Sequence, residues 1–213
     1  MKTILCYGDS NTWGYIPMTG LRYPEDVRWT GVAAKELGPE YRIIEAGLSG
    51  RRTVWDDPFD GYRNGLDGLG YFIHSAKPLD MVVLMLGTND LNHTDAFGCY
   101  KGLGVLVNRL LNAQAYYPSN EKVFKNGPKV LLVSPPIIHA DVAKLRPEIH
   151  LSGGHEDSCK VAAYVRRLAE ENNLPWMDAA EFAQPSVPDC LHLDPEGHLR
   201  LGQAIARKIR TIL

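Results

Sequence analysis

Ser10, Asp189 and His192 are the three side chains of this sequence that could together carry out nucleophilic chemistry. Ser10 ends a Gly8-Asp9-Ser10 turn near the start of the chain, and Asp189 precedes His192 by three residues near its end. A serine hydroxyl is a weak nucleophile that needs a base to take its proton, and the base needs an acid that orients it. These residue types predict nucleophilic catalysis by Ser10, provided that the fold brings the two ends of the chain together.

The elements that must position these residues can be read from the hydrophobic pattern. Apolar runs alternate with amphipathic stretches, as in β-α-β units around a parallel sheet. Residues 81–86 are uniformly apolar, which is typical of a strand covered on both faces. We predict a three-layer α/β/α, flavodoxin-like fold with a five-stranded parallel sheet, formed as a single domain over residues 1–213. The predicted strands are residues 3–7, 41–46, 81–86, 129–133 and 175–177, and the predicted helices are residues 29–37, 66–76, 102–115, 161–172 and 196–213.

Candidate functional residues follow the predicted strands. Ser10, Gly50 and Asn89 each come after a strand, while Asp189 and His192 precede the last helix. In an open parallel sheet, ligands bind beyond the carboxyl ends of the strands. We therefore expect these five residues to meet at that edge of the sheet.

Four ordered blocks of the sequence resemble those of the SGNH (GDSL-type) hydrolases. The blocks are Gly8-Asp9-Ser10, Gly47-Leu48-Ser49-Gly50, Gly87-Thr88-Asn89-Asp90 and Asp189-x-x-His192. A lone Gly-Asp-Ser occurs often by chance, whereas four blocks in order, each at a predicted strand end or loop, form a specific signal. Further stretches are similar to the arylesterase/acyltransferase branch of the family: Thr12-Trp13-Gly14, Arg28-Trp29-Thr30-Gly31, Asp56-Asp57-Pro58, Val133-Ser134-Pro135-Pro136 and Gly153-Gly154.

The resemblance implies a serine esterase that works through an acyl-enzyme. Ser10 would be the nucleophile, His192 the base and Asp189 the acid that orients it. The oxyanion would be held by the backbone N–H groups of Ser10 and Gly50 and by the side-chain amide of Asn89. The implied reaction is hydrolysis of short-chain aryl, alkyl or acetyl esters, with acyl transfer to alcohols as a second outcome. Carbohydrate acetyl esterases, thioesterases and lysophospholipases would use the same machinery.

Two departures from the family pattern concern the substrate pocket. Asn11 stands where the family usually has leucine, and we expect its polar side chain to alter the acyl pocket or to hydrogen-bond the substrate. The second block lacks the asparagine that some members carry, so Gly50 is assigned from its Gly-x-Ser-Gly context alone. We predict a narrow apolar pocket that favours small acyl groups, with core packing as the alternative for its aromatic residues. The candidate lining residues are Asn11, Trp13, Tyr15 and Ser49, with Ile16, Phe59 and Tyr62 as further apolar candidates.

Other polar residues near these blocks are expected to be structural. The resemblance implies that Asp9 is a structural carboxylate that braces the turn carrying Ser10. Asp194, followed by Pro195, has the pattern of a helix N-cap with proline in the first turn. His198 then falls in the first turns of that helix and is predicted to be structural.

A metal enzyme and a non-catalytic binding module are the two alternatives to an esterase. A metal enzyme is disfavoured because the histidine-rich stretch matches no standard zinc spacing. A non-catalytic module that only binds an acyl ligand would have no need of a complete serine, histidine and acid set. The sequence has no phosphate-binding glycine motif, and we expect no cofactor and no metal. The metal-ligand types in question are His139, Asp141, Glu148, His150, His155 and Cys159.

The net charge and the cysteine content indicate which partners and which cellular location to expect. The formal net charge of −2 on 213 residues gives no reason to expect nucleic acid or an anionic membrane as a partner. Cys6, Cys99, Cys159 and Cys190 have no framework spacing, which favours reduced thiols and a cytoplasmic location. There is no signal-peptide pattern and no apolar run of membrane-spanning length.

The long segment 135–157 suggests self-association. Resemblance to the acyltransferase branch implies a homo-oligomer whose neighbouring subunits narrow the pocket. The same aliphatic side chains could instead fold back on their own subunit. They are Ile137, Ile138, Val142, Leu145, Ile149 and Leu151.

Overall fold

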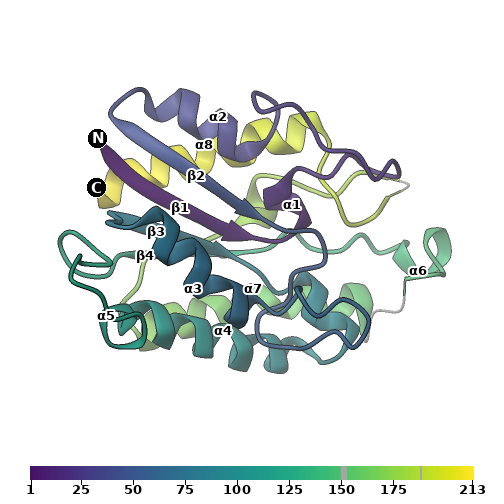
Figure 1. Cartoon of the computed structure of the whole chain (residues 1–213). Helices are drawn as coiled ribbons and strands as arrows, with labels where there is room; N and C mark the ends of the chain where they lie inside the picture. Colours follow the sequence, from purple (N-terminus) through teal and green to yellow (C-terminus); the bar gives the residue numbers. More distant parts are fainter. Residues whose placement is uncertain (150–152, 188) are drawn as a thin grey trace.

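A parallel β-sheet forms the middle layer of the computed structural model, with helices on both of its faces (Figure 1). The structure describes residues 1–149, 153–187 and 189–213. Within these residues the sheet has five strands in the order β2-β1-β3-β4-β5, and every neighbouring pair is parallel. The predicted α/β/α fold with a five-stranded parallel sheet is confirmed. The strands are β1 (Lys2–Gly8), β2 (Tyr41–Gly47), β3 (Met81–Met85), β4 (Val130–Ser134) and β5 (Trp176–Asp178).

Alternation along β1 divides the core between the two faces of the sheet. Ile4 and Cys6 belong to the cluster under α2 and α8, while Leu5 and Tyr7 belong to the cluster under α3, α4 and α7. Figure 1 shows α2 and α8 on one side of the strands and α3, α4 and α7 on the other. Burial on both faces explains why β3 is apolar at every position. The helices are α1 (Ser10–Trp13), α2 (Trp29–Leu37), α3 (Gly65–Ala76), α4 (Ala96–Leu111), α5 (Ala113–Tyr116), α6 (Val142–Leu145), α7 (Gly154–Glu171) and α8 (Pro195–Ile212), with 3-10 turns η1 (Thr88–Asn92) and η2 (Ala179–Glu181).

The predicted helix starts were correct where a cap or a sharp apolar face marks them. The predicted bounds 29–37 match α2, and α8 begins at Pro195 because Asp194 accepts a hydrogen bond from the Gly197 N–H at 2.7 Å. The predicted role of Asp194 as an N-cap is confirmed. His198 is fully buried in α8, where its Nδ1 accepts from the Trp29 N–H at 3.2 Å, so its predicted structural place is confirmed too.

Two predicted helix starts were wrong. The helix expected at 102–115 is α4, which begins at Ala96 and ends at Leu111 before the separate turn of α5. Asp95 caps it by accepting from the Gly98 N–H at 2.8 Å, and the cap outweighs the low helix propensity of the early glycines. The helix expected at 161–172 is α7, which begins at Gly154. Its true start was missed because the first two turns are polar and carry no apolar periodicity.

The carboxyl ends of three strands lie side by side. Gly8 at the end of β1 pairs with Gly47 of β2 on one side and with Met85 of β3 on the other. The segments that follow, including α1, therefore leave the sheet at the same edge, and α6 lies beyond that edge (Figure 1). The N- and C-termini lie at the opposite end of the sheet.

Candidate active site

Ser10 is the first residue of the short helix α1, which begins directly after β1. The Asp9 carboxylate caps this helix by accepting from the Asn11 N–H at 3.0 Å, so its predicted structural role in the turn is confirmed. Gly14 ends the helix in the left-handed conformation, with φ of 88°. The strand, the cap and the glycine together hold Ser10 at the carboxyl edge of the sheet.

His192 and Asp189 lie within hydrogen-bond distance of Ser10 in a single chain of contacts. His192 Nε2 is 2.9 Å from Ser10 Oγ, and His192 Nδ1 is 2.8 Å from Asp189 Oδ1. A carboxylate only accepts, so Nδ1 carries the proton and the lone pair of Nε2 faces the serine hydroxyl. The imidazole is thus in the tautomer that can take a proton from Ser10.

The Asp189 carboxylate is buried, and both of its oxygens accept hydrogen bonds. Its Oδ1 also accepts from the backbone N–H groups of His192 at 2.7 Å and Leu191 at 3.1 Å, and its Oδ2 accepts from the Met18 N–H at 3.2 Å. Burial alone would raise the pKa of this group, but hydrogen bonding and the nearby charge of His192 outweigh it and hold the pKa at about 2. Asp189 is therefore a stable anion beside the imidazole at neutral pH.

Arg146 is a contact of this site that the sequence did not reveal. Its Nη1 lies 3.1 Å from the carbonyl oxygen of Asp189 and 3.3 Å from Oδ2, and its Nε pairs with Glu148 at 2.5 Å. Arg146 belongs to the long segment 135–157, which the sequence linked to self-association and not to catalysis. No spacing in the sequence links this arginine to Asp189, since the contact depends on how the segment folds over the sheet edge.

The four residues predicted to line the substrate pocket lie in different environments. Tyr15 stacks on the His192 ring, with centroids 4.2 Å apart, and Trp13 lies against Tyr15 at 6.3 Å. Ser49 has a buried hydroxyl with no hydrogen-bond partner among the described residues. The Asn11 amide is buried and hydrogen-bonded to the backbone on either side of His192.

Phe59 and Tyr62, the further apolar candidates for the pocket, lie away from the protein interior. Phe59 is 93% exposed and Tyr62 is 64% exposed. Their loop is held at its base instead, where Asp57 Oδ2 pairs with Arg52 Nη2 at 2.7 Å. The expectation that these two rings line a pocket was wrong for the single chain, because the loop projects from the sheet edge.

Gly50 and Asn89, the residues predicted to hold an oxyanion, are linked through Arg51, the residue that follows Gly50. Asn89 Nδ2 donates to the carbonyl oxygen of Arg51 at 3.1 Å, which leaves the second hydrogen of this amide for a ligand. Gly50 has φ of 78°, and a Cβ there would come within 3 Å of the Arg63 side chain. The left-handed backbone conformation therefore favours glycine at this position, and a side chain there would also have to displace Arg63.

The buried side chains of Asp90 and Arg51 hold this arrangement in place. Asp90 accepts from the backbone N–H of Thr53 at 3.1 Å and from its hydroxyl, which fixes η1, the turn that contains Asn89. Arg51 Nη1 donates to the carbonyl oxygens of Gly8, at 2.8 Å, and Ala46, and its guanidinium lies over a tyrosine ring of β1. These contacts tie the ends of β1, β2 and β3 together.

Burial of Asp9 makes the stability of the protein depend on pH. Desolvation raises the pKa of Asp9 to about 6 despite its hydrogen bond from Asn11. The folded protein then binds this proton more tightly than the unfolded chain does. The stabilisation is fully present below about pH 4 and is lost as the pH rises through about 6.

We expect Asp9→Asn to remove this loss of stability at higher pH, because an amide does not titrate. The amide oxygen can still accept from the Asn11 N–H, so the helix cap is kept. The stability of the variant relative to wild type should increase by about 1 kcal/mol between pH 5 and pH 8. Urea unfolding at the two pH values measures this, with the exposed Asp26→Asn as the control for net charge. Equal pH slopes for Asp9→Asn and wild type would contradict the assignment.

Two histidines of the histidine-rich stretch contact backbone groups. His155 Nδ1 is 2.6 Å from the Ile138 carbonyl oxygen, and His139 Nδ1 accepts from the Asp141 N–H at 3.2 Å. In the part of the chain that the structure describes, no three histidine, cysteine or acidic residues are placed to hold a metal ion. His150, which was also considered as a ligand, lies outside the described residues.

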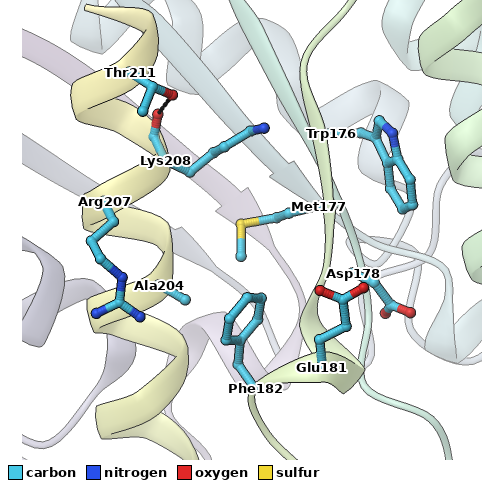
Figure 2. A pocket seen from close by; sticks show the side chains of 9 residues that line it. All are labelled: Trp176, Met177, Asp178, Glu181, Phe182, Ala204, Arg207, Lys208 and Thr211. Carbon is cyan, nitrogen blue, oxygen red and sulfur yellow. Dashed lines mark hydrogen bonds between the residues drawn. The ribbon is translucent and has the colours of Figure 1, made fainter.

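A cavity of about 470 Å³ lies at the β5 edge of the sheet, between β5, η2 and α8. Figure 2 shows Met177 and Phe182 lying between Lys208 and Arg207 of α8 and the Glu181 side chain. None of the residues predicted for catalysis or substrate binding lines this cavity. Its lining residues are Trp176, Met177, Asp178, Glu181, Phe182, Ala204, Arg207, Lys208 and Thr211.

Comparison with known proteins identifies the family of this chain. The profile of the GDSL-like lipase/acylhydrolase family matches residues 6–200, so the chain belongs to that family and is an SGNH hydrolase, as its sequence blocks predicted. No match was found among curated proteins.

Solved structures show the same fold over the whole chain. Est24, a carbohydrate acetylesterase from Sinorhizobium meliloti, is 36% identical with a TM-score of 0.89, and the aryl esterase of M. smegmatis is 34% identical with a TM-score of 0.88. In both cases the alignment covers 100% of each chain. A lipase/acylhydrolase from Enterococcus faecalis, 22% identical with a TM-score of 0.69 over 100% of this chain and 97% of its own, shares the fold.

Proposed function

We propose that this protein is a serine esterase that hydrolyses short-chain carboxylic esters through an acyl-enzyme on Ser10. The observation that carries the proposal is the chain of contacts from Ser10 Oγ to His192 Nε2 and from His192 Nδ1 to Asp189. In this proposal Ser10 is the nucleophile, His192 the general base and Asp189 the acid that orients it. Membership of an acylhydrolase family supports the reaction class.

In the acylation step, Ser10 Oγ attacks the carbonyl carbon of the ester while His192 Nε2 takes the hydroxyl proton. The carbonyl oxygen becomes an oxyanion, which the backbone N–H groups of Ser10 and Gly50 and the Asn89 amide stabilise. The bond between the carbonyl carbon and the alkoxy oxygen then breaks, and the alcohol leaves with the proton from His192. The buried Asp189 anion stabilises the imidazolium while it carries that proton.

The acyl-enzyme is resolved by a second attack on the same carbon. Water, with His192 again taking a proton, releases the carboxylic acid and restores Ser10. An alcohol in place of water gives a new ester, so acyl transfer needs no further catalytic group. The ratio of the two products depends on how well water is kept out of the site.

We propose small acyl groups, acetyl above all, as the substrates, on sugar or aryl alcohols. The structural relatives described as a carbohydrate acetylesterase and an aryl esterase support this class. Trp13 and Tyr15 support it as well, because bulky rings beside His192 limit the space for an acyl chain. A lysophospholipase or a thioesterase for long chains would need a longer apolar groove.

A series of p-nitrophenyl esters tests the proposal. We expect kcat/KM for the acetate to exceed that for the octanoate by about 10-fold or more, since a short pocket cannot hold the longer chain. Acetylated monosaccharides and aryl acetates should both be hydrolysed. A maximum at long chains would contradict the small pocket, and an inert protein that fails to react with an organophosphonate would favour a module that only binds acyl ligands.

We propose that the protein forms a homo-oligomer through the loops at the carboxyl edge of the sheet. Phe59, Tyr62, Met18 and Leu21 are all more than half exposed there, an arrangement that favours contact with a second copy. By contrast, Ile138 and Val142 pack within their own subunit. Leu151, a further candidate, lies outside the described residues.

Sedimentation velocity at micromolar concentration tests the oligomer. We expect a species larger than 23.7 kDa, and weaker association after Phe59→Ser, because the substitution removes the most exposed aromatic ring. A monomer for the wild type would overturn the proposal.

We further propose one catalytic domain over residues 1–213 and a cytoplasmic location. The family match over residues 6–200 supports the first. The second is supported by the thiols of Cys6, Cys99 and Cys159, which are free of disulfides. Among the described residues, no helix is both long enough and apolar enough to cross a membrane.

A further inference from the structure

The side chain of Asn11 joins the helix that carries Ser10 to the segment that carries His192. Asn11 Nδ2 donates to the carbonyl oxygen of Leu191 at 3.1 Å, and Asn11 Oδ1 accepts from the N–H of Leu193 at 3.0 Å. Leu191 and Leu193 are the two neighbours of His192 in the chain. The amide therefore holds the backbone on both sides of the imidazole.

These two hydrogen bonds constrain the orientation of the His192 segment as well as its distance from α1. They run in opposite directions from one planar amide, so they fix both the separation and the rotation of the 191–193 backbone relative to α1. The side chain is buried, at 3% exposure, and water cannot readily replace it. The bond between Ser10 Oγ and His192 Nε2, at 2.9 Å, spans the same two segments.

Other contacts of the His192 segment serve different purposes. The His192 N–H donates to Asp189 Oδ1 at 2.7 Å, and the His192 carbonyl accepts from the Ser186 N–H at 2.8 Å, which shapes the segment internally. The Met18 N–H reaches Asp189 Oδ2 at 3.2 Å, and so positions the acid from the chain beyond α1. The backbone next to the histidine is joined to α1 through Asn11.

We propose that Asn11 is a positioning residue that sets the distance between Ser10 Oγ and His192 Nε2. The inference rests on the proposed function, in which a proton passes between these two atoms. Proton transfer needs the donor and acceptor within hydrogen-bond reach, and a displacement of 1 Å can reduce the rate by about 100-fold. Leucine, the usual residue of the family at this position, could form neither bond.

Two substitutions and a control test the role. Asn11→Ala removes both bonds without adding volume, and Asn11→Leu introduces the usual family residue. Thr12→Val is the matched control, because Thr12 is buried in the same helix and its hydroxyl has no hydrogen-bond partner among the described residues. The readouts are kcat and KM for p-nitrophenyl acetate, the rate of organophosphonate labelling at Ser10, and the low-field proton signal of His192 Nδ1–H.

We expect kcat to fall between about 10- and 100-fold in both Asn11 variants, with KM within about 3-fold of wild type. Labelling of Ser10 should slow in parallel and the Nδ1–H signal should shift or broaden, while Thr12→Val behaves as wild type. If Asn11→Leu does not fold, Asn11→Ala decides the question by the same measurements.

The failures of this inference and of the proposed function can be told apart. Wild type that is never labelled at Ser10 would refute the proposed function. Wild type that is labelled, with folded Asn11 variants labelled equally fast and unchanged in kcat, would overturn only the role of Asn11. A rise in KM at constant kcat would also overturn it, since that result assigns Asn11 to substrate binding.

Discussion

Replacing Ser10 by alanine should reduce p-nitrophenyl acetate hydrolysis by roughly 10⁴- to 10⁶-fold, to the level of the buffer background. Alanine removes the oxygen that would attack the ester and leaves His192 and Asp189 without a nucleophile to activate. The methyl group fits the space of the hydroxymethyl group, so the fold should be unchanged. Initial rates compare the activity of the purified variant with that of wild type, and circular dichroism spectra compare their folding.

Ser75→Ala is the matched control for this experiment. Ser75 is exposed on α3, where its hydroxyl donates only to the Phe72 carbonyl oxygen at 3.2 Å, and the variant should keep full activity. Organophosphonate labelling followed by peptide mapping should place the adduct on Ser10 in wild type and find none in Ser10→Ala. Substantial activity in folded Ser10→Ala would refute the acyl-enzyme mechanism at this residue.

Asn89→Ala should lower kcat by about 10²- to 10³-fold, equivalent to about 3–4 kcal/mol of transition-state stabilisation. The amide is already oriented by its bond to the Arg51 carbonyl oxygen, so its second hydrogen needs no reorganisation to meet the oxyanion. Because the negative charge develops only in the transition state, KM should change much less than kcat.

Asn120→Ala, at an exposed position, provides the matched asparagine control and should leave both constants unchanged. Asn89→Asp is a sharper variant, since it keeps the shape but places an acceptor where a donor is needed. It should be at least as impaired as Asn89→Ala. If kcat survives in both folded variants, the oxyanion must be held by other groups, and Asn89 would be a turn residue only.

Much of the architecture followed from the pattern of apolar residues. Burial on both faces makes β3 continuously apolar, and a capping aspartate with proline marks the start of α8. The start of α4 was missed because a single cap at Asp95 outweighs the glycines that follow it. The polar first turns of α7 gave no periodic signal at all.

Residue type and order along the chain, together with the resemblance of four ordered blocks to the SGNH hydrolases, nominated Ser10, Gly50, Asn89, Asp189 and His192. A nucleophile, a base and an acid are recognisable by chemistry alone, and the parallel sheet requires that strand ends share an edge. The sequence could therefore indicate which groups would meet. It could not give the 2.9 Å between Ser10 and His192, which are 182 residues apart.

What the sequence determined by itself is the family, the α/β fold class and the set of candidate groups, because these depend on composition, periodicity and local motifs. Only the tertiary structure decided that Arg146 touches Asp189, that Asn11 holds the backbone beside His192, and that Phe59 faces outward. Each of these outcomes joins or separates segments distant in sequence. Such contacts are fixed by the packing of the whole core, so no short stretch of sequence encodes them.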